Sequence, residues 1–101
     1  MNYTFKENQL DYETYYILRK SVKWNNWSRE QAEIALVNSY YTVTVFDNKV
    51  PIGMGRAVGD GIYFMIMDIV VKPEYQRMGI GSTIIHMLLE HIEKNMCVGS
   101  R

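Results

Sequence analysis

The stretch Asp68–Gly81, DIVVKPEYQRMGIG, decides how the rest of this chain is interpreted. It joins the end of an apolar run to the start of a long apolar helix, and two glycines, Gly79 and Gly81, stand at that start. Glycine weakens a helix because it loses more conformational freedom on folding than any other residue. The two glycines therefore indicate that something approaches the backbone closely at this point.

A helix start that follows a strand and a short loop favours anion binding, because its first N–H groups have no intrahelical acceptor. Glycine at 79 and 81 leaves room for a phosphate, Arg77 adds a positive charge and Ser82 adds a hydroxyl. The alternative is that Gly79 only packs helix against sheet. Two common phosphate motifs are excluded: no Lys follows Gly81 as in a Walker A loop, and Ile84 replaces the third small residue of a dinucleotide fingerprint.

The same stretch resembles motif A of the GCN5-related N-acetyltransferase (GNAT) family. In that motif an apolar strand ends in Val-x-Pro, and Gln/Arg-x-x-Gly-x-Gly/Ala opens a helix. Val71–Pro73 and Gln76–Gly81 fill the pattern without a gap. Upstream, PIGMGRAVGDGIYF resembles the family's third strand and hairpin, and LRKSVKW resembles its first-helix segment, so the likeness extends over essentially the whole chain. Likeness of fold alone does not fix a substrate.

The resemblance implies acetyl-coenzyme A as cosubstrate and an amine of a small molecule or peptide as acceptor. In this family the loop and helix start bind the pyrophosphate, and the pantetheine arm pairs with the edge of the preceding strand, which usually carries a bulge. A backbone N–H near Ile69 or Val70 then stabilises the charge that develops on the thioester oxygen. The implied cosubstrate-binding residues are Ile69, Val70, Val71, Gln76, Arg77, Met78, Gly79, Ile80, Gly81 and Ser82.

Asp68 is the charged residue inside the apolar run IYFMIMDIVV. A buried carboxylate is costly without a partner, so it needs a partner or a purpose. One hypothesis is catalytic and substrate-binding: Asp68 faces the acceptor cleft, holds a cationic amine or relays its proton. The other hypothesis is structural: Asp68 bonds to backbone or to Arg56 on the neighbouring strand.

Further candidates lie outside the motif. Trp24 and Trp27 occupy a break between two helices that lines the acceptor pocket in the resembled family, and we expect one in the core and one in the pocket. The segment HMLLEH, residues 86–91, lacks the zincin order and an evident third ligand, so we expect no metal. His86 and Glu90 are expected as an exposed i,i+4 pair, and His91 borders the core.

Working outward, the pattern predicts a single α/β domain over residues 1–101, with a mixed sheet and the order β-α-α-β-β-β-α-(β). Asp11 and the Ser28–Gln31 capping box start two helices, the second running to about Asn38. Strands are expected at 3–9, 40–46, 50–59 and 62–71, with a hairpin at Asp60-Gly61. The last of these strands is apolar on both faces and is expected to be central.

The final helix is expected over about 79–95, where its apolar residues form one broad stripe. Met96–Gly99, with Cys97 as an inert core thiol, are expected to begin a parallel strand. That strand is barely begun at Arg101, so we expect either a longer natural protein whose C-terminal part is missing here or a sheet completed by a partner chain in a homodimer. The stripe consists of Ile80, Ile84, Leu88 and Ile92, broadened by Gly81, Ile85 and Leu89.

The amino-acid composition limits which partners and which cellular location are expected. The chain has 101 residues, 48% hydrophobic and 22% charged, with 11 basic and 11 acidic residues, so nothing in its net charge points to nucleic acid or an anionic membrane. Its one cysteine excludes an internal disulfide, and the N-terminus lacks the apolar segment of a signal peptide, so a cytoplasmic location is expected. Two alternatives to the enzyme stay open: a non-catalytic acyl-coenzyme A-binding module and a generic phosphate- or nucleotide-binding domain.

Overall fold

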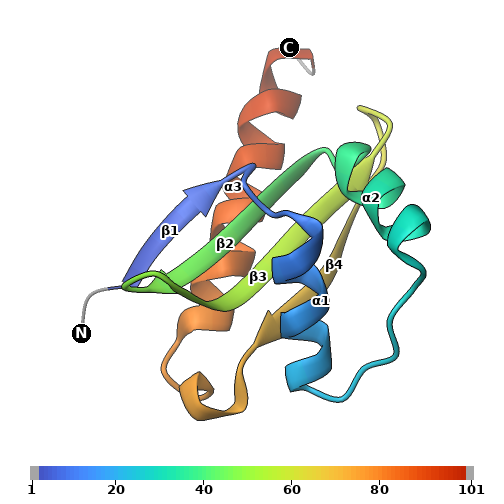
Figure 1. Cartoon of the computed structure of the whole chain (residues 1–101). Coiled ribbons are helices and arrows are strands. Elements are labelled where there is room, and N and C mark those ends of the chain that lie inside the picture. Colours follow the sequence, from blue (N-terminus) through green and yellow to red (C-terminus); the bar gives the residue numbers. More distant parts are fainter. Residues whose placement is uncertain (1–2, 100–101) are drawn as a thin grey trace.

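The computed structural model describes residues 3–99, and their side chains as far as Asn95. Four strands and three α-helices follow one another in the expected order, with a short 3₁₀ turn before the last helix (Figure 1). No helix within the described residues combines the length and the apolarity needed to cross a membrane. The elements are β1 (Tyr3–Glu7), α1 (Tyr12–Ser21), α2 (Arg29–Val37), β2 (Tyr41–Asp47), β3 (Val50–Gly59), β4 (Phe64–Val71), η1 (Pro73–Tyr75) and α3 (Ile80–Gly99).

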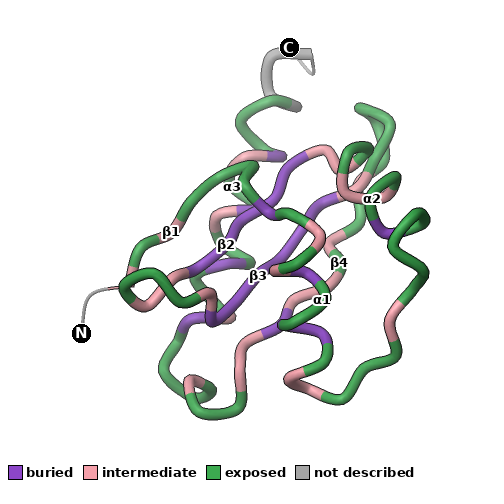
Figure 2. The backbone as a smooth tube through the Cα atoms, in the orientation of Figure 1, coloured by how far each residue is buried: buried purple, intermediate pink, exposed green. Residues whose placement is uncertain are grey.

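The strands form one antiparallel sheet in the order β1-β2-β3-β4, and helices cover both of its faces (Figure 1). α3 packs on one face against Val43, Val45 and Ile52, and α1 packs on the other against Met54 and Val70. The buried residues concentrate in β2 and β3, between the two layers of helix (Figure 2). The α/β architecture expected from the sequence is therefore confirmed.

Local sequence signals place the element ends as expected. The Asp11 carboxylate accepts the Thr14 N–H at 2.9 Å, and the Ser28 hydroxyl accepts the Gln31 N–H at 3.2 Å. The β3–β4 hairpin forms at Asp60, whose carboxylate accepts the Ile62 and Tyr63 N–H groups. Each of these bonds satisfies a backbone donor that the adjoining helix or strand leaves free.

The final helix differs from expectation at its end. α3 continues through Gly99, so the strand expected at Met96–Gly99 is wrong. No Pro or Gly interrupts α3 between Gly81 and Gly99, and each added helical residue gains a backbone hydrogen bond. The Cys97 side chain lies outside the described side chains.

The apolar stripe of α3 is narrower than expected. The four residues at its centre are buried against the sheet, with exposed fractions between 0% and 7%. Ile85 and Leu89, expected to broaden this face, are 37% and 43% exposed, because each is rotated about 100° around the helix from a stripe residue. The buried four are Ile80, Ile84, Leu88 and Ile92.

β4 is an edge strand of the described sheet, not a central one, since within residues 3–99 it pairs only with β3. Its apolar pattern has another cause: Val70 packs toward α1 and Ile69 toward α3, so helices cover both faces near its end. An apolar strand sequence therefore indicates that both faces of the strand are covered, and does not indicate how many neighbouring strands pair with it. Nearer the hairpin, Met65 and Met67 stay 61% and 39% exposed.

Candidate functional site

In the loop between β4 and α3, the glycine just before α3 has an unusual backbone conformation. Gly79 has φ +81°, in the left-handed region, and a Cβ atom built there meets nothing within 4 Å. The first α3 hydrogen bond runs from the Thr83 N–H to the Gly79 carbonyl at 3.1 Å. The N–H groups of Gly79 to Ser82 therefore have no intrahelical acceptor, and they lie beside open space.

A pocket of about 360 Å³ lies at this helix start, between the end of β4 and the first turn of α3. It brings together most of the residues that the sequence marks for cosubstrate binding. Two marked residues lie elsewhere: Val70 is buried on the α1 side, and the Met78 sulfur accepts a hydrogen bond from the Tyr3 hydroxyl. The pocket is lined by Ile69, Val71, Tyr75, Gln76, Arg77, Gly79, Ile80, Gly81 and Ser82.

Gln76 has a role in the loop that the sequence did not reveal. Its side-chain amide donates to the Val71 carbonyl at 2.9 Å, and so fixes the chain where it leaves β4. The Lys72 N–H donates to the Ile52 carbonyl at 2.9 Å, which holds the same end of β4 on β3. These bonds set the start of α3 beside the strand edge.

β4 carries a bulge directly above this pocket. Met54 faces Val70 and Arg56 faces Met67, so Asp68 and Ile69 together oppose the single residue Gly55. Asp68 adopts φ +57°, which is uncommon for a residue other than glycine. The bulge that the family resemblance implies is thus present in this strand.

The Asp68 carboxylate is almost fully buried, with 8% of the side chain exposed. One oxygen accepts from Arg19 at 2.6 Å, and the other accepts from Arg56 Nε at 2.8 Å and from the Tyr15 hydroxyl at 3.0 Å. The Arg56 partner is the one named by the structural hypothesis, whereas Tyr15 and Arg19 were not predicted. The available signal for them was their spacing of four residues, which places both side chains on one face of α1.

The Tyr15 hydroxyl is held in its protonated form at this cluster. Burial raises its pKa above the ordinary value, and the Asp68 carboxylate raises it further, while Arg19 and Arg56 oppose the rise. A tyrosine with a raised pKa stays a hydrogen-bond donor over the whole neutral range. Tyr15 therefore adds a permanent donor to the two guanidinium groups.

Neither tryptophan belongs to the core. Trp24 is 44% exposed and Trp27 is 58% exposed, so the expectation that one of them is buried is wrong. The α1–α2 segment that carries them contributes few buried apolar side chains, and its start is anchored by polar contacts instead. Arg19 lies over the Trp24 ring at 5.2 Å and donates to the Asn25 carbonyl.

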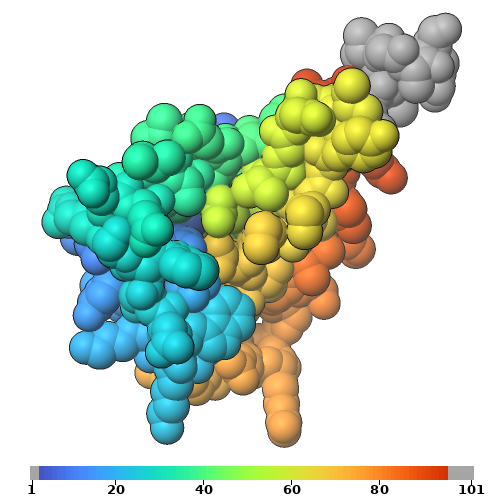
Figure 3. All heavy atoms as spheres, turned by 90° about the vertical axis from the view of Figure 1, so that its right-hand side faces the viewer, coloured from blue at the N-terminus to red at the C-terminus, as the bar shows by residue number. Residues whose placement is uncertain are grey.

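The segment that carries the tryptophans lies at the same end of the molecule as the β4–α3 loop. Figure 3 shows the edge of the sheet in yellow and orange, with the α1–α2 segment on one side and α3 on the other. A shallow pocket joins Tyr16 and Lys20 of α1 to Pro73 and Glu74 of η1. The second half of α1, which leads into the tryptophan segment, therefore adjoins η1 at the start of the β4–α3 loop.

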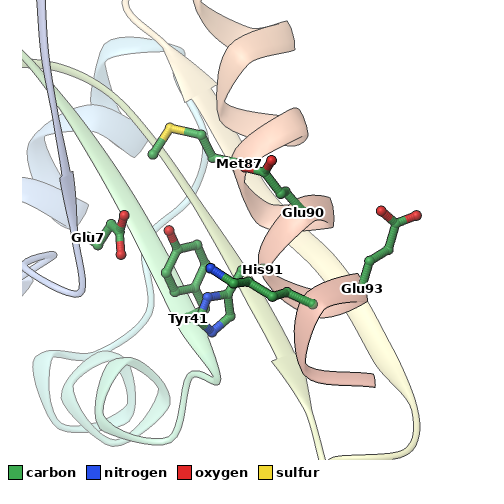
Figure 4. A pocket seen from close by; sticks show the side chains of 7 residues that line it. Glu7, Tyr41, Met87, Glu90, His91 and Glu93 are labelled. Atoms are coloured by element: carbon green, nitrogen blue, oxygen red, sulfur yellow. The ribbon is translucent and has the colours of Figure 1, made fainter. Parts of the chain in front are cut away.

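A second pocket, of about 520 Å³, lies between Tyr41 at the start of β2 and the later turns of α3 (Figure 4). Tyr41 and His91 stack there with ring centroids 3.8 Å apart, which agrees with the expected place of His91 at the core border. Besides Lys94, three carboxylates line this pocket. They belong to Glu7, Glu90 and Glu93.

His86 and Glu90 are both exposed, as expected for the polar face of α3. Within the part of the chain that the structure describes, no group of three His, Cys, Asp or Glu residues is arranged to hold a metal ion.

The buried tyrosine of the second pocket predicts a pH dependence of stability. Burial, followed by the Glu7 carboxylate, raises the pKa of Tyr41 to about 12. The unfolded chain releases this proton near pH ~10, before the folded chain does, so the free energy of unfolding falls as pH rises from about 10 to 12. Urea unfolding at pH 8, 10 and 11 measures the fall. Tyr41→Phe should lose part of the slope, and an unchanged slope would contradict the assignment.

Residues 3–100 match the acetyltransferase (GNAT) family. The chain belongs to the GNAT family. It is 30% identical, over 79 residues, to the uncharacterized N-acetyltransferase ycf52 of Pyropia yezoensis. That match covers 73% of this chain and 45% of the relative, so the chain spans less than half of this GNAT relative's length.

Solved GNAT structures share the fold. A probable acetyltransferase of unknown function from meticillin-resistant Staphylococcus aureus superposes with a TM-score of 0.86 at 35% identity, covering 92% of this chain and 71% of that one. The PaiA N-acetyltransferase of Thermoplasma acidophilum, solved in complex with coenzyme A, gives a TM-score of 0.73 at 18% identity. The second match covers 93% of this chain and 74% of that chain and supports the fold alone.

Proposed function

We propose that this GNAT chain binds acetyl-coenzyme A and moves its acetyl group to the amine of a small molecule or peptide. The observation that carries the proposal is the pocket at the start of α3, where the left-handed Gly79 leaves unbonded N–H groups beside open space. Membership of the GNAT family supports the reaction type, and a coenzyme A complex of a protein with this fold supports the cosubstrate.

Each part of the proposed site has its own role in binding or catalysis. Backbone N–H groups from Arg77 to Ser82 bind the pyrophosphate, with the positive end of α3 and the Arg77 side chain adding attraction. The edge of β4 from Ile69 to Val71 pairs with the pantetheine arm, as an added strand pairs with a sheet. The bulge turns a backbone N–H at Ile69 toward the thioester oxygen, where negative charge develops.

The reaction balances as a direct transfer. The amine nitrogen forms a bond to the acetyl carbonyl carbon, and the carbon–sulfur bond breaks. The amine gives up one proton, and the departing thiolate takes up one. Holding the two reactants in line beside a fixed N–H donor supplies most of what this step needs.

Calorimetry with coenzyme A and with ATP tests the binding part. We expect binding of coenzyme A and much weaker binding of ATP, because only the former has an arm that pairs with β4. A preference for ATP would overturn the proposal in favour of a nucleotide-binding domain. Transfer of ¹⁴C-acetyl to a panel of amines then separates an enzyme from a binding module that lacks catalysis.

The cytoplasmic location and the homodimer expected from the sequence stay predictions. Sedimentation of the purified chain tests the second of them.

A further inference from the structure

The backbone of Asp68 needs an external restraint. Asp68 lies at φ +57° inside a strand, a strained conformation for a residue other than glycine that persists where the surroundings fix it. The bulge also removes one regular pairing from the edge of the sheet, opposite Gly55. Something beyond the strand ladder must therefore hold Asp68 in place.

The Asp68 side chain supplies that restraint. Arg56 reaches it from β3, and Arg19 reaches it from α1, so the carboxylate is gripped from two separate elements. Arg56 is itself fixed by a bond from Nη1 to the Ser39 hydroxyl at 3.2 Å. Both arginine side chains are only 11% exposed, and at this depth the ion pairs are screened little by solvent or salt.

Arg19 also connects the cluster around Asp68 to the loop that follows α1. One end of its guanidinium bonds Asp68, and the other end donates to the carbonyl of Asn25, while its plane lies over the Trp24 ring. A planar guanidinium holds two partners in a fixed relation, which a lysine ammonium does not do. The loop after α1 is therefore tied to the bulge of β4 through one side chain.

We propose that Asp68 is a positioning residue and that the ion triad Arg19–Asp68–Arg56 fixes the β4 bulge and the loop around Trp24 relative to each other. The consequence for acetyl transfer rests on the proposed function: the triad sets the distance between the thioester side, at Ile69, and the acceptor side, at Trp24. The triad keeps Asp68 from serving as the proton acceptor, since both of its oxygens are taken by donors in a buried site.

Arg19→Lys tests in the free protein whether the ion triad holds the β4 bulge and the Trp24 loop together. Lysine keeps the positive charge beside Asp68 but loses the fork to Asn25. In ¹H–¹⁵N spectra we expect the Ile69 amide and the Trp24 indole signals to move together. The matched control is Arg29→Lys, whose partners Glu13 and Glu33 are exposed, and it should move neither signal.

A second variant separates the contact of Asp68 with β3 from the contact of Arg19 with the Trp24 loop. Arg56→Lys weakens the grip on Asp68 from β3 but leaves Arg19 on the Trp24 loop, so it should move the Ile69 signal far more than the Trp24 signal. It also serves if Arg19→Lys does not fold. Wild-type signals at both positions in either folded variant would overturn the proposal, as would a Trp24 signal that moves alone in Arg19→Lys.

The bound state provides a test that a merely structural role would not affect. With acetyl-coenzyme A labelled with ¹³C at the carbonyl, an N–H donor at the bulge should move the carbonyl resonance downfield on binding. In Arg19→Lys we expect this movement to shrink while the Kd for coenzyme A stays within about twofold, because the pyrophosphate site lies at α3. Acetyl transfer to an amine accepted by the wild type should fall about 100-fold.

The two proposals fail in different ways. If the wild-type chain does not bind coenzyme A, the proposed function is wrong, and the spectra of the free protein still decide whether the triad holds bulge and loop together. If coenzyme A binds normally but Arg19→Lys keeps the full carbonyl movement and the full rate, the positioning role of Asp68 is wrong.

Discussion

Gly79→Val should weaken binding of coenzyme A at least tenfold, which corresponds to about 1.4 kcal/mol. A Cβ atom added at Gly79 meets no atom within 4 Å in the folded chain, so the valine side chain extends into the space that the proposed pyrophosphate site needs. Valine also resists φ +81°, and the loop that presents the N–H groups shifts as a result. Isothermal calorimetry with coenzyme A measures the change.

A matched control separates backbone strain from the loss of the anion site. Gly61 has φ +102° in the β3–β4 hairpin and is likewise free of contacts to an added Cβ. Gly61→Val should therefore cost similar strain and leave the affinity for coenzyme A unchanged. If both variants fold and bind coenzyme A with equal affinity, Gly79 serves only the left-handed turn before α3, and its proposed place in the anion site is wrong.

The sequence predicted those parts of the fold that depend on short-range chemistry. The Asp11 and Ser28 caps and the Asp60 turn each depend on residues within four positions of one another, and all three formed. The loop before α3 was predictable for the same reason, because a strand end, two glycines and a helix start are contiguous in the chain. Their gathering around one pocket followed from connectivity alone.

Long-range partners were the part that sequence reasoning missed. Tyr15 and Arg19 lie 53 and 49 residues from Asp68, and only the packing of α1 on the sheet brings them to it. Hydrophobic pattern also misplaced β4, since helices on both faces give an edge strand the composition of a central one. The exposed tryptophans show the same limit: an aromatic residue in a loop does not reveal whether a helix covers it.

Gly55→Ala should destabilise the fold by about 1–3 kcal/mol, the usual cost of overpacking a filled core. Gly55 lies opposite the bulge, and a Cβ there would stand 2.5 Å from Ile84 Cγ2 and 2.6 Å from Ile69 Cδ1. Ile84 is fully buried, and its Cγ2 branches directly from Cβ, so it cannot swing away without moving α3. Thermal unfolding should show the loss as about 4–8 °C per kcal/mol.

Two companion variants decide whether the clash is the cause. Gly53→Ala lies on the same strand, where the nearest atom to an added Cβ is 3.3 Å away, and it should cost less than Gly55→Ala. Ile69→Val removes the Cδ1 atom that the new methyl meets, so combining it with Gly55→Ala should recover part of the loss in a double-mutant cycle. Recovery would show that α3, the bulge and Gly55 are packed as one unit, which ties the stability of the core to the geometry of the proposed thioester site. Strict additivity of the two changes would show that Ile69 moves freely, and that the bulge depends on the core for none of its shape.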